Sequence, residues 1–229
     1  PHHGKRVRVS SEQGLGHTRQ MARFASILKQ RGATVLVECQ QEVRPLIRSV
    51  PGVDQIVEDV DAESFDFQIP FLSLPGVIGV TAASVPAEVP YGFCDEETVS
   101  DWREALSAHS GFKVGIVWQG NPEFRQDAQR SIPLAELAPL ARLPGVTLFS
   151  LQKDHATGQL AEVPFGHTIV DLADKLDDFG QTAAVMKNLD LVITCDSAPA
   201  HLAGALAVPV WVALPFAPDW RWLLERDDS

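Results

Sequence analysis

Short apolar runs alternate with helical runs along almost the whole 229-residue chain. In the first half, the apolar runs Arg6–Ser10 and Thr34–Cys39 flank an amphipathic helical pattern over Thr18–Arg31. Strands that alternate with helices pair in parallel, because each helix carries the chain back to the starting edge of the sheet. The sequence therefore predicts an α/β protein built from βαβ units.

The rest of the chain keeps this rhythm and divides into two halves. The further elements predicted are a helix over 43–50, strands over 55–58, 67–70, 112–118, 146–152, 167–171, 190–195 and 208–214, helices over 133–142, 179–188 and 198–206, and a helical segment from Pro218. A proline-rich stretch, Ser84–Tyr91, precedes an acidic helical segment over 95–109. We therefore predict a Rossmann-like domain over 1–93, a linker with a helix over 94–111 and a second Rossmann-like domain over 112–229, with a cleft between the two.

The composition limits the partners and the location of such a protein. The chain has 30 acidic residues against 19 lysines and arginines, which argues against a nucleic-acid partner. Cys39, Cys94 and Cys195 lack the spacing of a metal site and are interpreted as reduced thiols. No apolar run is long enough to cross a membrane, and the first residues lack the apolar core of a signal peptide. We predict a cytoplasmic protein without integral membrane association.

The stretch from Leu191 to Leu206 has the pattern of an anion site. An apolar strand runs into Asp196, and a helix of small residues with Pro199 in its first turn carries His201. The free N–H groups at the start of such a helix attract a diphosphate. Asp196 then accepts from a sugar or ribose hydroxyl, and His201 donates to phosphate or sugar. The alternative is that Asp196 only caps the helix and His201 is an ordinary surface histidine.

A second polar loop is predicted at the same edge of the same sheet. The strand Lys113–Trp118 leads into the loop 119–131, which ends with Arg130 and Ser131 before a helix. Ligands of open α/β sheets collect outside the carboxyl ends of the strands. Arg130 and Ser131 therefore offer a forked cation and a hydroxyl to phosphate oxygens.

A glycine loop follows the first strand and contains Gln13, Gly14, Gly16, His17 and Thr18. We expect its glycines to allow a sharp turn and close approach to a ligand, with His17 and Thr18 projecting into the cleft. One alternative is that His17 only caps the following helix.

The glycine loop also invites a dinucleotide interpretation. Gly14 and Gly16 open a helix, and Glu38 at the end of the next strand has the spacing of a ribose-binding acid. Arg19, however, occupies the position of the third glycine, where close packing of strand and helix requires a small residue.

Several motifs occur together in the order that they have in one known family. They are Glu12–Thr18, Val117–Pro122, Arg130–Pro133, Ser150–Lys153, Asp196–Gly204 and Leu214–Trp222. Together they resemble the glycosyltransferase module that follows tetratricopeptide repeats in many bacterial proteins. This module is similar to the lipopolysaccharide heptosyltransferases of glycosyltransferase family nine, and more remotely to O-GlcNAc transferases. The resemblance implies a GT-B fold, with two Rossmann-like domains that face each other across a cleft.

The resemblance also implies roles for individual residues. The donor nucleotide sugar is held mainly by the second domain and needs no metal, which agrees with the absence of an Asp-x-Asp pair at a strand end. The implied donor-binding residues are Gln119, Asn121, Arg130, Ser131, Lys153, Asp196, Ser197 and His201. In the first loop, His17 stands where the heptosyltransferases carry an aspartate base, and Glu12 is the nearest alternative base.

The function expected from these features is inverting transfer of a sugar from a nucleotide-sugar donor to an unidentified acceptor, a glycan, a lipid or a protein. An imidazole can act as the base at neutral pH. Two rivals remain open: a catalytically silent nucleotide-sugar-binding or scaffold module, which His17 and the short C-terminus favour, and an epimerase-like enzyme. No repeat of about 34 residues is present, so a tetratricopeptide-repeat segment is expected to be missing or to be supplied by a partner.

Overall fold

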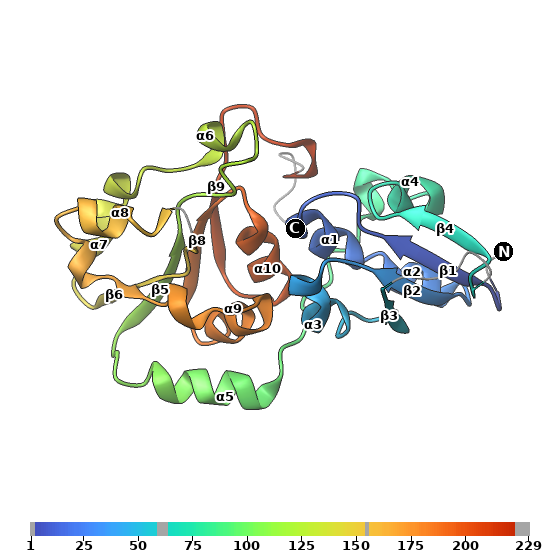
Figure 1. Cartoon of the computed structure of the whole chain (residues 1–229), viewed down its shortest axis with the longest axis horizontal. Coiled ribbons are helices and arrows are strands. Elements are labelled where there is room, and N and C mark those ends of the chain that lie inside the picture. The colour runs from blue at the N-terminus through green and yellow to red at the C-terminus, as the bar shows by residue number, and fades with distance from the viewer. Residues whose placement is uncertain (1–2, 59–63, 154–155, 223–229) are drawn as a thin grey trace. The chain divides into compact units, whose positions relative to one another are not determined.

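The computed structural model describes residues 3–58, 64–153 and 156–222 (Figure 1). The chain divides into two compact units, one reaching to Phe93 and the other running from Cys94 to Trp222. Each unit contains one sheet, and every strand pair in both sheets is parallel. No helix of the described residues is long and apolar enough to cross a membrane.

The first unit is a four-stranded sheet with its helices. Its strands are β1 (Arg6–Ser10), β2 (Thr34–Glu38), β3 (Gln55–Val57) and β4 (Phe67–Pro70), in the order β3-β2-β1-β4. Its helices are α1 (Leu15–Ala22), α2 (Ala25–Gln30), α3 (Arg44–Ile47) and α4 (Leu74–Ile78). The buried residues of β1 and β2 include Val9, Val35 and Val37. Strand β1, which leads into the glycine loop, is therefore held by core side chains.

The single helix predicted over Thr18–Arg31 is wrong in its extent. Two helices occupy this region, and the first begins at Leu15, inside the glycine loop. They are separated at Arg23 and Phe24, where the Arg23 carbonyl accepts from the Ser26 hydroxyl at 2.9 Å. A side-chain donor on this carbonyl competes with the helical ladder. The Arg23 guanidinium also turns away, toward the Pro86 carbonyl and the Tyr91 hydroxyl.

The second unit is a five-stranded sheet in the order β7-β6-β5-β8-β9. Its strands are β5 (Phe112–Val117), β6 (Val146–Ser150), β7 (Val170–Asp171), β8 (Leu191–Cys195) and β9 (Val210–Ala213). Its helices are α5 (Glu96–Ala105), α6 (Asp127–Arg130), α7 (Ala138–Ala141), α8 (Gln159–Glu162), α9 (Phe179–Met186) and α10 (Ala198–Ala205). The helix predicted over 133–142 is a 3₁₀ turn, Leu134–Leu137, followed by α7, and the strand predicted over 167–171 is reduced to two residues. The segment predicted as helical from Pro218 contains a 3₁₀ turn over Trp220–Trp222, and its continuation lies outside the described residues.

The second sheet is covered on one face by an apolar cluster that continues from its strands into the segments after β5 and β6. Ile116 and Trp118 pack there with Leu134 and Leu148, and all four are almost completely buried. Helix α10 packs on β8 and β9, and α9 packs against both α5 and α10. The carboxyl ends of β5 and β8 are therefore anchored by core side chains.

Helix α5 belongs to the second unit and lies within the segment 94–111, which the sequence predicts as a linker with a helix. Asp95 caps it by accepting from the Thr98 backbone N–H at 2.8 Å. The Trp102 indole N–H donates to Gln181 of α9 at 2.7 Å, and the Asn188 amide donates to the Val99 carbonyl at 2.9 Å. These contacts fix α5 beneath α9, where Figure 1 shows it.

Three aspartates fix the starting points of the strands. Asp66 accepts from the Arg6 backbone N–H at 2.8 Å, Asp54 from Val35 at 2.8 Å and Asp190 from Lys113 at 2.7 Å. Each aspartate thereby holds a neighbouring strand in register at the amino edge of its sheet. This edge lies opposite to the one where ligands of α/β sheets bind.

Replacing Asp54 with asparagine is expected to lower the free energy of unfolding at pH 7 by about 1 kcal/mol. Burial alone raises the pKa of Asp54, but hydrogen bonds from Lys29 and from the Val35 N–H outweigh it and hold the pKa below its ordinary value. The ionised carboxylate thus stabilises the fold above the ordinary pKa of aspartate, and this contribution is lost as the pH falls through the lowered pKa. Urea unfolding at several pH values measures the effect. A difference between wild type and variant that stays constant down to pH 3 contradicts it, and D101N, at an exposed position on α5, is the control.

Candidate functional site

The carboxyl ends of β5 and β8 lie side by side in the middle of the second sheet. Val117 of β5 pairs with Thr194 of β8. From β5 the chain crosses to β6 on one side, and from β8 it crosses to β9 on the other. A crevice forms where the connections of an α/β sheet diverge in this way, and ligands bind there. Both polar loops predicted from the sequence follow these two strands.

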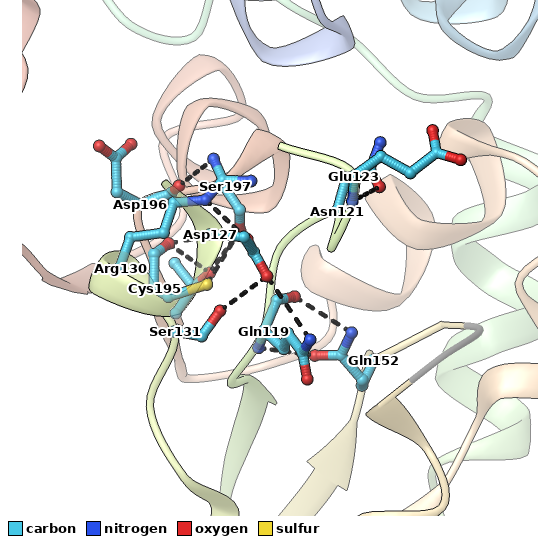
Figure 2. Close-up of polar contacts among 11 residues, drawn as sticks. Gln119, Asn121, Glu123, Asp127, Arg130, Ser131, Gln152, Cys195, Asp196 and Ser197 are labelled. Carbon is cyan, nitrogen blue, oxygen red and sulfur yellow. Dashed lines mark hydrogen bonds and ion pairs between the residues drawn. The ribbon is translucent and has the colours of Figure 1, made fainter. Parts of the chain in front are cut away.

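On the β8 side, the chain turns into α10 through Asp196 and Ser197. Ser197 is the N-cap residue, so the alternative that Asp196 caps this helix is wrong. The Ser197 hydroxyl does not cap α10 either. It donates to the Cys195 carbonyl at 3.3 Å, and its side chain is buried beside Thr194. The Asp196 carboxylate has no hydrogen-bond donor among the described residues and points away from Asp127 and Ser131 (Figure 2).

His201 lies one turn into α10 and stacks on an aromatic ring. Its imidazole is parallel to the Trp222 indole within 11°, with ring centroids 5.0 Å apart. Arg221, which precedes Trp222 in the chain, forms an ion pair with Asp219 at 3.0 Å. Burial lowers the pKa of Arg221, and the nearby carboxylates of Asp219 and Asp196 act against that shift. The segment after β9 therefore brings a second guanidinium into the neighbourhood of Asp196.

On the β5 side, Arg130 reaches across to the end of β8. Its Nη1 donates to the Asp196 backbone carbonyl at 2.8 Å, and its Nε donates to the Asp127 carboxylate at 2.9 Å (Figure 2). The Phe124 ring lies against the guanidinium, 4.6 Å from ring centroid to Cζ. A Cβ at Gly120 would collide with Arg130 Nη2, so this position has to be glycine for the guanidinium to sit over the strand end. Arg130 thus joins the two loops that the sequence predicts at this edge.

Other predicted donor residues on this side have structural partners. Ser131 donates its hydroxyl to Asp127 at 3.1 Å. Asn121 closes its own turn, because its side-chain oxygen accepts from the Glu123 N–H at 2.9 Å. The Lys153 ammonium donates to the Leu176 carbonyl. Gln119 alone among these extends between neighbours on both sides, donating to Asp127 at 3.5 Å and accepting from Gln159 at 3.1 Å.

Four further residues shape this site, and none of them was predicted from the sequence as a site residue. Asp127 is almost completely buried and accepts from Arg130 and Ser131. Gln152 ties together the ends of β5 and β6, because its side-chain oxygen accepts from the Trp118 and Gln119 N–H groups at 3.1 and 3.0 Å. Gly120 and Arg221 are the other two. The sequence signals are weak, since Asp127 lies in a loop with several polar residues and only its partners in space show that it is buried.

The glycine loop of the first unit is held by side-chain hydrogen bonds. The Thr18 hydroxyl is buried, donates to Gln40 at 3.0 Å and lies 2.9 Å from the Ser11 hydroxyl. Gln40 in turn donates to the Gln13 carbonyl at 2.6 Å. The Glu12 carboxylate accepts from the Leu72 backbone N–H at 3.3 Å. The loop therefore has a defined shape at the carboxyl end of β1.

Three expectations about this loop are corrected. Gly14 is the N-cap residue of α1, so His17 lies in the first turn of the helix and does not cap it. Neither Gly14 nor Gly16 has a positive φ, so the turn itself does not depend on glycine. Thr18 points into the hydrogen-bonded interior of the loop, where Ser11 and Gln40 engage it.

Glu38, the acidic residue of the dinucleotide interpretation, has a partner within the first unit. Glu38 forms an ion pair with Arg8, whose Nε lies 2.8 Å from the carboxylate. Both contacts from the Arg8 guanidinium reach the same carboxylate oxygen, Oε2. Arg19 is buried on α1 at the position of the third glycine. The structure therefore gives no support to a nicotinamide site in the first unit.

A family model matches part of the second unit of this chain. Residues 134–214 match the model of Glycosyltransferase family 9 (heptosyltransferase). The matched segment includes Lys153, Asp196, Ser197 and His201. Protein FlbA of Caulobacter vibrioides is 26% identical over 247 residues, which cover 96% of this chain and 41% of FlbA. The chain thus spans less than half the length of this relative.

Two solved structures have a similar fold over most of the chain. A glycosyl transferase family 9 protein from Veillonella parvula gives a TM-score of 0.67 at 16% identity, covering 92% of this chain and 80% of its own. The ADP-heptose lipopolysaccharide heptosyltransferase II of E. coli gives 0.63 at 15% identity, covering 90% and 84%. These matches confirm the predicted α/β GT-B fold. Together with the family match, they support a glycosyltransferase, while the tetratricopeptide-repeat association and the likeness to O-GlcNAc transferases stay predictions.

Proposed function

We propose that this chain is an inverting, metal-independent glycosyltransferase that moves a sugar from a nucleotide-sugar donor to an acceptor hydroxyl. The single observation that carries the proposal is the Arg130 guanidinium, which bridges from the β5 loop to the Asp196 carbonyl at 2.8 Å. A cation is thereby fixed beside the start of α10, where backbone N–H groups attract phosphate oxygens. The nucleoside diphosphate of the donor is bound between these two groups.

The leaving group is stabilised by charge in this proposal. As the bond between sugar and diphosphate breaks, negative charge grows on the phosphate oxygens. In this proposal, Arg130 and the first N–H groups of α10 stabilise that charge, and the hydrogen bond from Arg130 to the Asp196 carbonyl supports this role. Asp196, whose carboxylate has no donor among the described residues, accepts from a hydroxyl of the sugar or ribose. His201, oriented by Trp222, donates to a phosphate or sugar oxygen.

The acceptor hydroxyl is deprotonated by His17 of the first unit. The imidazole lies in the first turn of α1, at the carboxyl end of β1. Imidazole side chains in general titrate near neutral pH, so a neutral imidazole can accept a proton there. Glu12 is the second candidate base. A silent nucleotide-sugar-binding module is the alternative function, and the substitution of histidine for the family's aspartate favours it.

The experiment that tests the function combines binding with product analysis. A thermal-shift screen with UDP, GDP, ADP and CMP identifies the nucleotide, because a ligand at 100 times its dissociation constant stabilises a fold by about 2.7 kcal/mol. Incubation with a panel of matching nucleotide sugars then separates the candidates: a transferase transfers or hydrolyses the sugar, a silent module only binds, and an epimerase-like enzyme returns an isomer. Absence of binding by every nucleotide contradicts the donor site.

Nucleotide binding is expected to be the same in EDTA and in Mg²⁺. The described residues contain no group of three or more His, Cys, Asp or Glu side chains that could hold a metal ion, and Arg130 supplies the positive charge in this proposal. Titration calorimetry of the preferred nucleoside diphosphate with and without EDTA measures this. Loss of binding in EDTA that Mg²⁺ restores contradicts the metal-independent mechanism.

A further inference from the structure

Asp127 is a buried carboxylate that the proposed mechanism has not used. Its side chain is 5% exposed, although it lies at the start of a short helix in a polar loop. A buried charge is costly unless it is paired and hydrogen-bonded. Its Oδ1 accepts from Arg130 Nε at 2.9 Å, and its Oδ2 accepts from the Ser131 hydroxyl at 3.1 Å. The carboxylate therefore has partners on both oxygens.

The ion pair between Asp127 and Arg130 also fixes the direction in which the Arg130 guanidinium points. With Nε on Asp127 and Nη1 on the Asp196 carbonyl, the plane of the guanidinium is determined, and Phe124 lies against it. No described residue accepts a hydrogen bond from Nη2. A guanidinium that is planar and held at two of its nitrogens can offer the third to a phosphate in one orientation.

A line of side-chain amides fixes the carboxylate in turn. The Leu134 N–H donates to Gln159 at 3.2 Å, Gln159 donates to Gln119 at 3.1 Å, and Gln119 donates to Asp127 Oδ2 at 3.5 Å. Every hydrogen bond in this line points toward Asp127. Its Oδ2 accepts from Gln119 and Ser131, and its Oδ1 accepts from Arg130. Only a side chain that accepts on both oxygens satisfies all these donors. An asparagine would present an N–H to one of them.

We propose that Asp127 is the positioning residue for Arg130 and sets the orientation in which its guanidinium meets the departing diphosphate. This inference rests on the proposed function, because it assigns Arg130 the same ligand. Asp127 itself does not touch the donor. It acts through the Nε contact and keeps the guanidinium from rotating when charge develops on the phosphates.

The effect on catalysis separates positioning from charge. D127N removes a negative charge beside Arg130, so the affinity for the nucleoside diphosphate is expected to stay equal or to rise. The turnover number is expected to fall about 10–100-fold, because a misoriented guanidinium loses more of its stabilisation of the transition state than of the ground state. In the R130A background, D127N is expected to have no further effect on turnover, since its target is gone. A residue with only a structural role lowers turnover equally in both backgrounds and lowers the melting temperature with it.

A second measurement tests the positioning without using activity. Nitrogen-15 NMR measures how fast the Arg130 Nε–H proton exchanges with water. This exchange is expected to be slow in the wild type, and its rate is expected to rise at least tenfold in D127N. D101N, which changes an exposed aspartate on α5 in the same way, is the control and leaves the exchange rate unchanged. If D127N does not fold, D127E keeps the charge, displaces the carboxylate by one methylene and is expected to produce the same rise in exchange.

The outcomes distinguish this inference from the proposed function. Equal Arg130 Nε–H exchange in wild type and D127N overturns the positioning role, whatever the activity. Equal losses of turnover caused by D127N with and without Arg130 overturn it as well. If the wild type neither binds a nucleoside diphosphate nor turns over a nucleotide sugar, the proposed function fails, while the exchange measurement still decides whether Asp127 orients Arg130.

Discussion

H17A is expected to lower the rate of sugar transfer about 10²–10⁴-fold with little change in the affinity for the donor. Proton abstraction from the acceptor matters only in the transition state, so removing the base affects turnover and leaves ground-state binding intact. Steady-state kinetics with the donor identified in the nucleotide screen, together with calorimetry of the nucleoside diphosphate, measures both quantities. H17D restores the carboxylate of the resembled family and is expected to retain or raise activity.

The silent-module alternative predicts a different pattern from the same variants. Wild type and H17A are then equally inactive with every donor, and H17D gains turnover if the rest of the site is intact. An active wild type whose rate H17A does not change contradicts both hypotheses and moves the base to another residue of the first unit. E12Q then becomes the variant to test, although the Glu12 carboxylate already accepts from the Leu72 N–H.

R130A is expected to weaken binding of the nucleoside diphosphate by roughly 1.5–3 kcal/mol, the contribution of one charge-assisted hydrogen bond. This corresponds to about 10–150-fold in the dissociation constant. The substitution also leaves Asp127 buried without its counter-ion, so a lower melting temperature is expected alongside weaker binding. Titration calorimetry below the melting temperature of the variant separates the two effects. R103A, at an exposed position on α5, is the matched control.

H201A is expected to weaken the same binding within the same range, because it removes one donor at the start of α10. Loss of the imidazole also removes the surface on which Trp222 stacks. W222A is therefore a useful companion variant, since a smaller loss of affinity in W222A than in H201A indicates that the imidazole itself contacts the ligand. Unchanged affinity in both R130A and H201A contradicts the donor-site assignment.

Much of the architecture was predictable because strand and helix signals are local. The runs at Arg6–Ser10, Thr34–Glu38 and Leu191–Cys195 form strands almost where hydrophobic patterning predicts them. Helix boundaries were less predictable, since they depend on caps and on competition from side chains. Helix α1 begins earlier than predicted, directly after its N-cap residue Gly14. It also ends earlier than predicted, at Ala22, and the Arg23 carbonyl beyond this end accepts a hydrogen bond from the Ser26 hydroxyl.

The candidate site was predictable to the level of the two loops, because the carboxyl ends of parallel strands meet at one edge of a sheet. The prediction that Arg130 and Asp196 lie together is confirmed by their hydrogen bond. The alternative that Asp196 only caps the helix is wrong, because Ser197 takes the N-cap position. The roles of all the predicted site residues toward a substrate, from His17 in the first unit to His201 in the second, stay predictions.

The sequence by itself determined the α/β class, the order of the elements and the pair of loops that carry the polar residues, because these follow from periodicity and from the rule for parallel sheets. Only the tertiary structure decided which of those residues are buried and which hydrogen-bond partners each of them has. Asp127 and Ser131 are both polar loop residues in the sequence, yet one is a buried acceptor and the other donates to it. The physical reason is that burial and hydrogen-bond direction depend on groups distant in the chain, such as Gln159 and the Asp196 carbonyl, whose positions relative to Gln119 and Arg130 no local pattern encodes.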